Sequence, residues 1–522
     1  MDTIELVVLL LAVIAVVTLV ARRVGVPFPI LMVVVGLPLG LVPGFGNVVL
    51  EPELVLFLFL PPILFGAAYL SSPRELWRSV RSISLLAFGL VLTTTAAVAF
   101  VLVSLIPGIG WAAAIAFGAI VSPPDAIAAT AIAQRLGLPR RLVVVLEGES
   151  LLNDATALVT YRLAVAAAAP LAASVQPAAV AVDFVVVAVG GVLIGLVVGV
   201  VASWLLDTLN DPPVEVLITL IAPFAAYLPA EQIHVSGVLA AVTGGLVLGW
   251  KSPHVMSSDT RVLGVGAWQM VTFVVNGMAF LLIGLQLPAV LEAVSGRDAG
   301  ELIGLAAAVA VTVIVVRLLW VYPATYLPRW LIPAVGRRDP APPATIPLIL
   351  GWAGMRGAVS LAAAIGLPAG FPERDLLLFL TFTTILVTLV GQGLTLPPLI
   401  RRLGVGDDGS LEHEELHARD VATQAALRRL EELPTEIPGH QPIIDQLRDR
   451  YAHRAEHYVH THDEAPLSAE EAEEVDHEAI RRAVLAAERQ AVLELRDRGI
   501  VSDEALRAVE RDLDLEELRR DI

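Results

Sequence analysis

The run VLEGESLLNDATALV at residues 145–159 gathers polar side chains inside a segment with apolar flanks. Glu147, Ser150 and Asp154 recur at i, i+3 and i+7, so a helix places them on one face. Glu149 and Asn153 lie at i and i+4 on a neighbouring face. A charge at the bilayer centre costs about 2.5–3.5 kcal/mol on insertion scales, so these groups are expected to face the protein interior or a cavity.

Two other apolar segments are expected to be broken helices. In IAFGAIVSPPDAIAATAIA a proline pair, Pro123 and Pro124, directly precedes Asp125, and in LILGWAGMRGAVSLAAAIG three glycines surround Arg356. A proline pair removes two backbone donors and clashes with the preceding turn, so the helix must break there. Broken backbone at membrane depth is tolerated where it lines protein or an aqueous cavity. Two such segments predict inverted repeats that meet at a midplane site.

Together these segments predict a site for a monovalent cation. One polar face of 145–159 offers Asp154, Ser150 and the amide oxygen of Asn153, and Asp125 joins them from the broken segment. Ser122 is a weaker candidate ligand. Burial and mutual repulsion of two carboxylates both disfavour the charged form, so the same oxygens can hold a cation or a proton. Competition for one site, combined with movement of the helix bundle between the two sides, gives antiport.

The neighbouring polar face predicts a structural ion pair. An unpaired guanidinium in mid-span would be costly, and a carboxylate is its natural complement, so Glu149 is the expected partner of Arg356. Arg162 and Arg317 are expected near the ends of their spans or to reach toward water, without a function.

Composition predicts an all-α, multi-pass membrane protein. The chain has 522 residues, is 56% hydrophobic, has a mean hydropathy of +0.75 and holds no cysteine, which excludes disulfides and cysteine-ligated metals. The first apolar stretch is acidic before and basic after, the reverse of a cleavable signal peptide. Hydropathy indicates about thirteen spans. They lie near 4–20, 28–42, 53–70, 83–106, 111–133, 142–168, 179–206, 214–230, 235–250, 262–287, 301–323, 345–366 and 375–400.

Charge divides the chain and orients it. Residues 404–522 hold 31 acids and 15 arginines, nearly all of the net charge of −17, so we expect a membrane domain at 1–403 and an acidic, mostly helical tail at 404–522. The loops on one side of the predicted spans carry 15 arginines and lysines, and the other side has only Arg297 and Arg374. The positive-inside rule then predicts a cytoplasmic tail and an N-terminus outside the cell membrane.

Four stretches resemble the monovalent cation/proton antiporters of the NhaP and eukaryotic sodium/proton exchanger family. They are EGESLLND at 147–154, SPPDAIAATAIAQRLGLPRRL, GMRGAVSLA at 354–362 and LPPILFGAAY at 60–69. The resemblance covers most of residues 1–403 and does not extend into the tail. It implies an NhaA-like fold with inverted repeats and two discontinuous helices, in which a six-helix core moves against a dimerisation domain of a homodimer.

The resemblance also implies roles for single residues. Asp125 and Asp154 would bind the cation and the proton, Asn153 would stabilise the broken helices, and Ser150 would supply an oxygen. Glu149 and Arg356 would be the structural ion pair. The Asn-Asp order at 153–154 is similar to that of electroneutral members.

This sequence departs from the family pattern at three places. Gly66 stands where some relatives have an acid, and Pro124 replaces a threonine, so only its carbonyl could serve as a ligand. The last span has no arginine, which leaves Glu147 without a partner, and Glu147 is expected near the cytoplasmic mouth. In the tail, His453, His457 and His460 share a helical face that could hold a metal or sense pH, although a solvated face is the simpler interpretation.

The sequence favours a secondary-active Na+/H+ antiporter that serves sodium transport and pH homeostasis. Its partners would be a monovalent cation, the proton, the lipid bilayer and a second copy, with no cofactor and no nucleic acid. Enzymatic motifs for nucleotides, nucleophiles or zinc are absent from the sequence. A K+/H+ antiporter stays open because both ions take oxygen ligands. A cation channel or membrane sensor is the alternative from another class, and broken helices around paired acids favour exchange.

Overall fold

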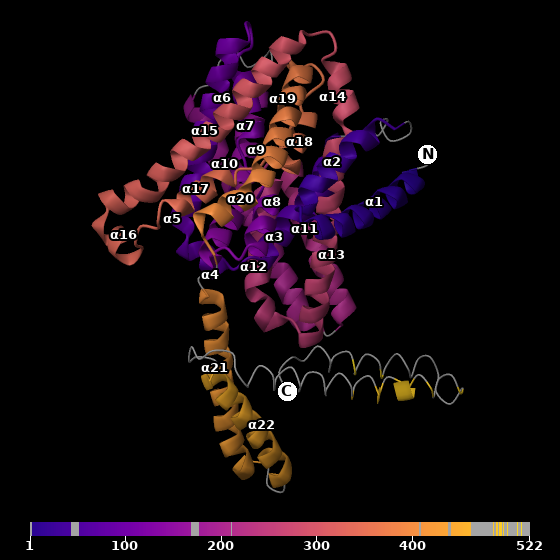
Figure 1. The fold of residues 1–522 in the computed structure, drawn as a ribbon, viewed down its shortest axis with the longest axis vertical. Coiled ribbons are helices and arrows are strands. Elements are labelled where there is room, and N and C mark those ends of the chain that lie inside the picture. The colour runs from indigo at the N-terminus through magenta and orange to yellow at the C-terminus, as the bar shows by residue number, and fades with distance from the viewer. Residues whose placement is uncertain are drawn as a thin grey trace. The chain divides into compact units, whose positions relative to one another are not determined.

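The computed structural model describes residues 3–42, 52–168, 177–209, 211–406, 409–436 and 440–460, with scattered residues between 484 and 513. This described part is helical and contains no strand (Figure 1). It falls into two compact units, the membrane unit Met1–Asp408 and the tail unit Gly409–Ile522. The prediction of an all-α protein is therefore confirmed.

The first half of the membrane unit contains one broken helix and one π-helical turn. Its elements are α1 (Thr3–Val24), α2 (Phe28–Gly40), α3 (Pro52–Leu70), α4 (Pro73–Arg78), α5 (Val80–Ser84), a π-helical turn (Leu85–Leu90), α6 (Val91–Leu105), α7 (Trp111–Val121), α8 (Ala126–Arg135) and α9 (Arg140–Ala167). Pro61 and Pro62 lie inside α3. A membrane helix tolerates such prolines when neighbouring groups satisfy the backbone carbonyls that they free.

The second half contains the longest helices. Its elements are α10 (Pro177–Thr208), α11 (Pro212–Gln232), α12 (Gly237–Val255), α13 (Ser258–Leu285), α14 (Leu287–Ala293), α15 (Ala299–Leu331), α16 (Pro333–Arg338), α17 (Thr345–Trp352), α18 (Ala358–Ile365), α19 (Arg374–Leu386), a second π-helical turn (Val387–Gln392) and α20 (Gly393–Leu403). Each predicted span overlaps one of these helices or a broken pair.

Length and composition qualify eight of the described helical segments as membrane spans, and α2 and α3 are shorter apolar helices. The apolar side chains of α10 are largely exposed, for example Val186 at 57% and Val197 at 62%. Since a helix that exposes valines so widely needs an apolar solvent or partner, these surfaces agree with a multi-pass membrane protein.

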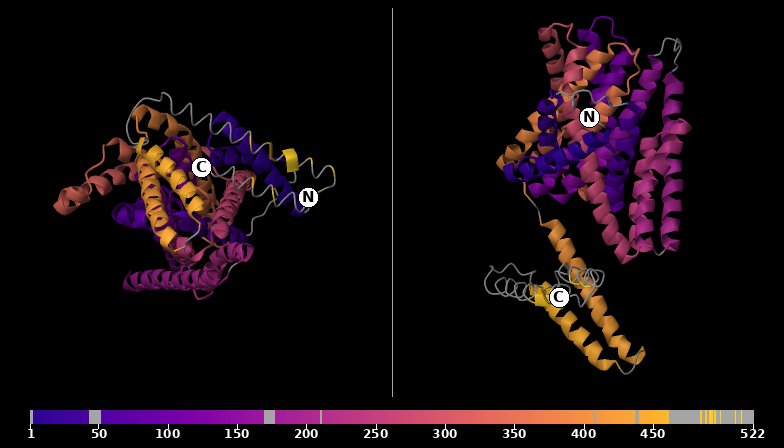
Figure 2. Two further views of the ribbon diagram at one scale, coloured as in Figure 1. Left: turned by 90° about the horizontal axis from the view of Figure 1, so that it is seen from below. Right: turned by 90° about the vertical axis from the view of Figure 1, so that its right-hand side faces the viewer.

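The helices of the membrane unit pack into two groups. The scaffold group consists of α1–α3 and α10–α13, in which α10 lies along α12, α12 along α3, and α13 along α2. The core group consists of α4–α9 and α15–α20, in which α7 packs against α6 and α9, and α15 packs against α6 and α17. In Figure 2, right, the magenta helices of the scaffold group stand side by side along one flank. The two broken helices, α7–α8 and α17–α18, both belong to the core group.

Small residues allow close packing inside the scaffold group. Gly36 of α2 and Gly284 of α13 face each other so closely that a Cβ on Gly284 would lie 2.4 Å from the carbonyl oxygen of Val33. Glycines at such contacts let helix backbones approach within a membrane, where dispersion drives association.

The tail unit contains a helical hairpin. Its two helices are α21 (Ser410–Glu436) and α22 (Gln441–His460), which pack against each other and bury Leu430 and Ile444. The side chains of His457 and His460 lie outside the described residues, and His453 is exposed.

Candidate ion-binding site

Two broken helices meet within the core group. α7 ends at Val121 and α8 begins at Ala126, while α17 ends at Trp352 and α18 begins at Ala358. The backbone N–H of Asp125 donates to the carbonyl oxygen of Met355 at 2.7 Å, which joins the two breaks directly. The predicted pair of discontinuous helices is therefore confirmed, and each break lines protein, as the membrane requires.

Asp125 stands at the start of α8. Its Oδ1 accepts a hydrogen bond from the backbone N–H of Ile127 at 2.8 Å, so the carboxylate caps this half-helix at its positive end. Its other oxygen lies against the second break, because a Cβ on Gly357 would stand 1.7 Å from Asp125 Oδ2. Only glycine at 357 leaves room for this carboxylate.

α9 presents its polar face to the first break. Asn153 Nδ2 donates to the carbonyl oxygen of Pro124 at 3.1 Å, and the backbone N–H of Ala126 donates to Ser150 Oγ at 3.4 Å. Asn153 is fully buried, and its Oδ1 has no hydrogen-bond partner among the described residues. Asn153 thus ties α9 to the break with its amide nitrogen and has its amide oxygen free.

Asp154 follows Asn153 on α9 and is 5% exposed. It lies one turn after Ser150 on the same face of α9 and directly after Asn153, which is bonded to the first break. The structure therefore brings together Asp125, Asp154, Ser150 and Asn153, the residues that the sequence predicts as ligands.

Ser122 and Pro124, the weaker candidates, are engaged in other bonds. The Ser122 hydroxyl donates to the carbonyl oxygen of Ala119 at 3.1 Å, one turn back in the same helix. The Pro124 carbonyl accepts from Asn153, as described above. Both oxygens lie at the break, but each already has a partner.

The predicted Glu149–Arg356 pair is wrong. Glu149 forms a two-pronged ion pair with Arg317 of α15, with Arg317 Nη2 2.9 Å from Glu149 Oε2, and both side chains are at most 1% exposed. Arg317 also donates twice to the carbonyl oxygen of Leu350, at 3.0 and 3.3 Å, near the end of α17. The pair links α9, α15 and the second broken helix.

Arg356 is instead bonded to backbone. Its Nε donates to the carbonyl oxygen of Val121 at 3.0 Å, its Nη2 donates to that of Ser122 at 3.4 Å, and its Nη1 donates to that of Gly354. These carbonyls stand where helices break, so they have no helical N–H donors and the guanidinium supplies them. Its own backbone N–H donates to Thr388 Oγ1 at 3.1 Å in the second π-helical turn.

The expectation for Arg317 fails because α15 is longer than the predicted span. The helix continues through Pro323 to Leu331, which puts Arg317 near its middle. Arg162 does lie near the end of α9, but it is bonded to Glu231 of α11. Glu147 is half-buried near Arg140, which pairs with Glu75 at 2.8 Å.

Loop residue Asp339 fastens the arginine-rich end of the core group. It pairs with Arg141 of α9 at 2.7 Å, with Arg329 of α15 at 2.8 Å and with Arg81 of α5. Burial alone would raise the pKa of Asp339, but the hydrogen bond and charge of Arg141, with the other two arginines, hold it below its usual range. Within the described residues, no group of three His, Asp or Glu side chains could hold a resident metal.

Comparison with known proteins shows which family and which fold this chain resembles. Residues 8–402 match the family described as sodium/hydrogen exchanger, transmembrane. An uncharacterised Na+/H+ exchanger of Mycobacterium tuberculosis is 36% identical over 522 residues, which cover 98% of this chain and 95% of that protein. This alignment extends into the tail, where the sequence motifs predict no resemblance.

Two further matches concern activity and fold. The sodium, potassium, lithium and rubidium/H+ antiporter of Bacillus subtilis is 33% identical over 76% of this chain and 62% of its own length. The solved sodium proton antiporter MjNhaP1 from Methanocaldococcus jannaschii superposes with a TM-score of 0.57 at 18% identity, over 77% of this chain and 98% of that one. This structural match shows a shared fold.

Proposed function

Because the chain belongs to the sodium/hydrogen exchanger family, we propose that it exchanges Na+ for H+ at a site formed by Asp125 and Asp154. Cation:proton antiport is the activity that this membership gives, and the family consists of membrane transporters, not enzymes. The choice of ion, the site and the stoichiometry are our proposal.

One observation carries the proposed site. Asp125 lies at the bond between the two broken helices, and Asp154 directly follows Asn153, whose amide nitrogen is bonded to the first break, with Ser150 and the free amide oxygen of Asn153 beside it. Hard monovalent cations prefer such oxygen ligands. A buried pair of carboxylates is stabilised either by a cation or by a proton, so binding of one favours release of the other.

The bonds around the site keep it rigid during this competition. Asn153, Arg356 and the Glu149–Arg317 pair hold the ends of both breaks by bonds that do not use the aspartate oxygens. The core group could therefore move as one body against the scaffold group and carry the site from one side to the other. Asn153 adds no charge beside Asp154, which favours exchange of one cation for one proton.

The preferred ion is less constrained by these ligands. Oxygen ligands serve both Na+ and K+, and the Bacillus subtilis relative is named for four alkali cations. K+/H+ exchange is therefore the second candidate, and the transport assay below includes it.

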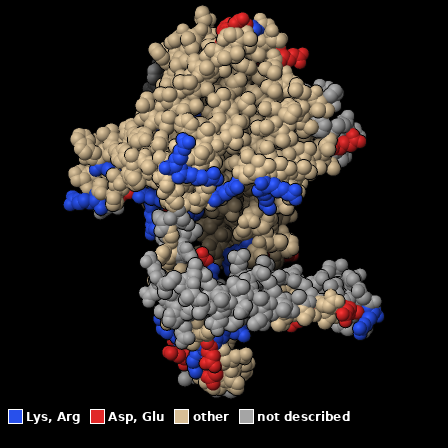
Figure 3. Space-filling model, in the orientation of Figure 1, with Lys and Arg blue, Asp and Glu red and all other residues tan. Residues whose placement is uncertain are grey.

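We further propose that the arginine-rich end of the membrane unit faces the cytoplasm. On the face in Figure 3, Lys and Arg gather in a band toward one end of this unit. Arg401 and Arg402 close α20 just before the tail, which would place residues 404–522 in the cytoplasm. We assign this segment a regulatory role and the exposed face of α10 a role in a homodimer interface.

Reconstitution in liposomes with an acidic lumen and a lumenal pH dye tests the proposal. Addition of Na+ outside should dissipate the pH gradient, and Asp154→Asn should abolish the effect. Parallel additions of K+ and Li+ identify the preferred ion. An exchange rate that does not change when the membrane voltage is clamped supports exchange of one cation for one proton. Full exchange activity in Asp154→Asn would refute the proposed site.

A further inference from the structure

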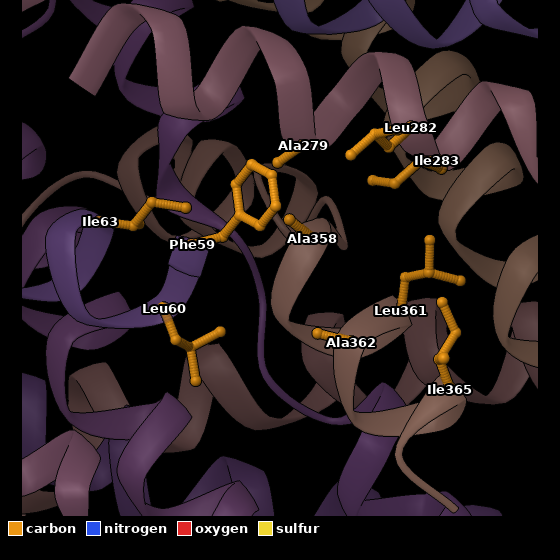
Figure 4. Close-up of a pocket in the computed structure, with 10 residues that line it drawn as sticks. All are labelled: Phe59, Leu60, Ile63, Ala279, Leu282, Ile283, Ala358, Leu361, Ala362 and Ile365. Carbon is orange, nitrogen blue, oxygen red and sulfur yellow. The ribbon is translucent and has the colours of Figure 1, made fainter. Parts of the chain in front are cut away.

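Part of the contact between the core and scaffold groups is apolar. A small cavity lies between α3, α13 and α18, and its walls are formed by residues such as Phe59, Ala279 and Ala362 (Figure 4). All of its lining side chains are apolar. Apolar contacts have no directional bonds, so packed apolar surfaces can slide past each other without breaking a specific bond. A polar contact between the two groups must break when they move, so it would influence how often they move.

One such contact lies beyond the ion site. Arg162 Nη2 of α9, in the core group, lies 2.7 Å from both carboxylate oxygens of Glu231 of α11, in the scaffold group. The Arg162 side chain is 38% exposed and that of Glu231 is 19% exposed. Arg162 follows Asp154 by two helical turns, about 12 Å along the axis, toward the end of α9 that is away from Arg140.

Glu231 is held firmly on the scaffold side. Its Oε1 accepts from the backbone N–H of Gly237 at 3.1 Å, at the start of α12. The turn itself is fixed, since the backbone N–H of Ser236 donates to the carbonyl oxygen of Val187 in α10 at 3.1 Å. Arg162 therefore binds a carboxylate that is fixed to three scaffold helices.

We propose that the Arg162–Glu231 pair is an ionic latch. It must open when the ion site becomes accessible from the end of the membrane unit at which Arg162 and Glu231 lie. This inference rests on the proposed exchange, in which the core group moves against the scaffold group. α9 carries both Asp154 and Arg162, so movement of the site relative to α11 stretches this pair. The latch stabilises the state that is closed at this end and sets how often that state opens.

A matched pair within one group provides the control. Arg140 of α9 and Glu75 of α4 form a similar ion pair at 2.8 Å, with 36% and 30% exposure, but both belong to the core group. Since α4 and α9 move together in this account, the Arg140–Glu75 pair does not open during exchange.

Cross-linking tests the latch, and the natural chain has no cysteine to interfere. Two double variants, Arg162→Cys/Glu231→Cys and Arg140→Cys/Glu75→Cys, are reconstituted in liposomes. A bifunctional thiol reagent about as long as the two replaced side chains joins each pair, since a direct disulfide needs closer backbones. Cross-linking should stop exchange in the first variant only. Continued exchange in the cross-linked first variant, or arrest in both, would overturn the latch.

A second measurement does not depend on transport. Ala362 is buried in the cavity wall between the core and scaffold groups. In Ala362→Cys, the rate of reaction with a membrane-impermeant thiol reagent therefore reports how often the two groups separate there. Adding Arg162→Gln should speed labelling about two- to fivefold, the range for one partly exposed ion pair, and adding Arg140→Gln should not. Equal labelling rates would contradict the latch. If no cation moves protons in the unsubstituted protein, the exchange proposal fails, while this labelling comparison still decides the latch.

Discussion

The Glu149–Arg317 pair gives the sharpest prediction about stability. Both side chains are at most 1% exposed, and Arg317 also supplies two hydrogen bonds to the Leu350 carbonyl. Arg317→Met would leave a buried carboxylate unpaired, which costs about 3–5 kcal/mol, and would leave the carbonyl without its donor, which adds about 1 kcal/mol. The apparent melting temperature in detergent should therefore fall by roughly 5–15 °C.

A double-mutant cycle isolates the pair. Glu149→Gln alone should also destabilise strongly, because it leaves the Arg317 charge buried. The double variant Glu149→Gln/Arg317→Met should be little worse than either single variant, which corresponds to a coupling of about 3–5 kcal/mol, close to the cost of one unpaired buried charge. Thermal unfolding followed by tryptophan fluorescence measures all four proteins.

The same cycle with Arg356 is the control. Arg356 donates to the carbonyls of Val121, Ser122 and Gly354, so its coupling to Glu149 should be much smaller. A larger coupling of Glu149 with Arg356 than with Arg317 would refute the pairing described here.

Two further predictions concern the site and the arginine-rich end. Gly357→Ala places a methyl group on the Asp125 carboxylate, so exchange in liposomes should fall about tenfold to a hundredfold. Gly304→Ala, at an open position, is the control and should leave the exchange rate unchanged. Equal exchange rates in the two variants would contradict the close contact at Gly357. Asp339→Asn should lower stability by about 1 kcal/mol at pH 7. Because the pKa of Asp339 is depressed in the folded state, its contribution is present above the unfolded value of about 3.9 and is lost as the pH falls through the folded value, so variant and natural chain should unfold alike at the lowest pH. A stability difference that persists there would contradict the role of this carboxylate.

The sequence could predict the breaks and the polar face of α9. Prolines and clustered glycines in apolar segments have few interpretations, and the spacing of Ser150 and Asp154 defines a helical face. A buried polar face of α9 is expected to point to the site at the breaks, which predicts that Asp154 lies on the side of α9 that faces Asp125.

The partners of the buried arginines could not be predicted in this way. Arg317 lies in mid-helix only because α15 continues past Pro323, and hydropathy ends the span near that proline. Arg356 donates to backbone carbonyls that are free to accept only because both helices break beside it. A sequence pattern does not reveal which backbone carbonyls will be free to accept, so a carboxylate is the partner that the sequence predicts for a buried arginine.

Counting the protons released when a cation binds tests the central claim most directly. Calorimetric titration of the detergent-solubilised protein with Na+, in buffers of different ionisation enthalpy, gives this number. Competition at Asp125 and Asp154 predicts about half a proton released per Na+ bound at the pH at which the site is half-protonated, and a release that rises toward about one proton at lower pH. Asp154→Asn should lose this release. Na+ binding with no proton release at any pH would contradict the account.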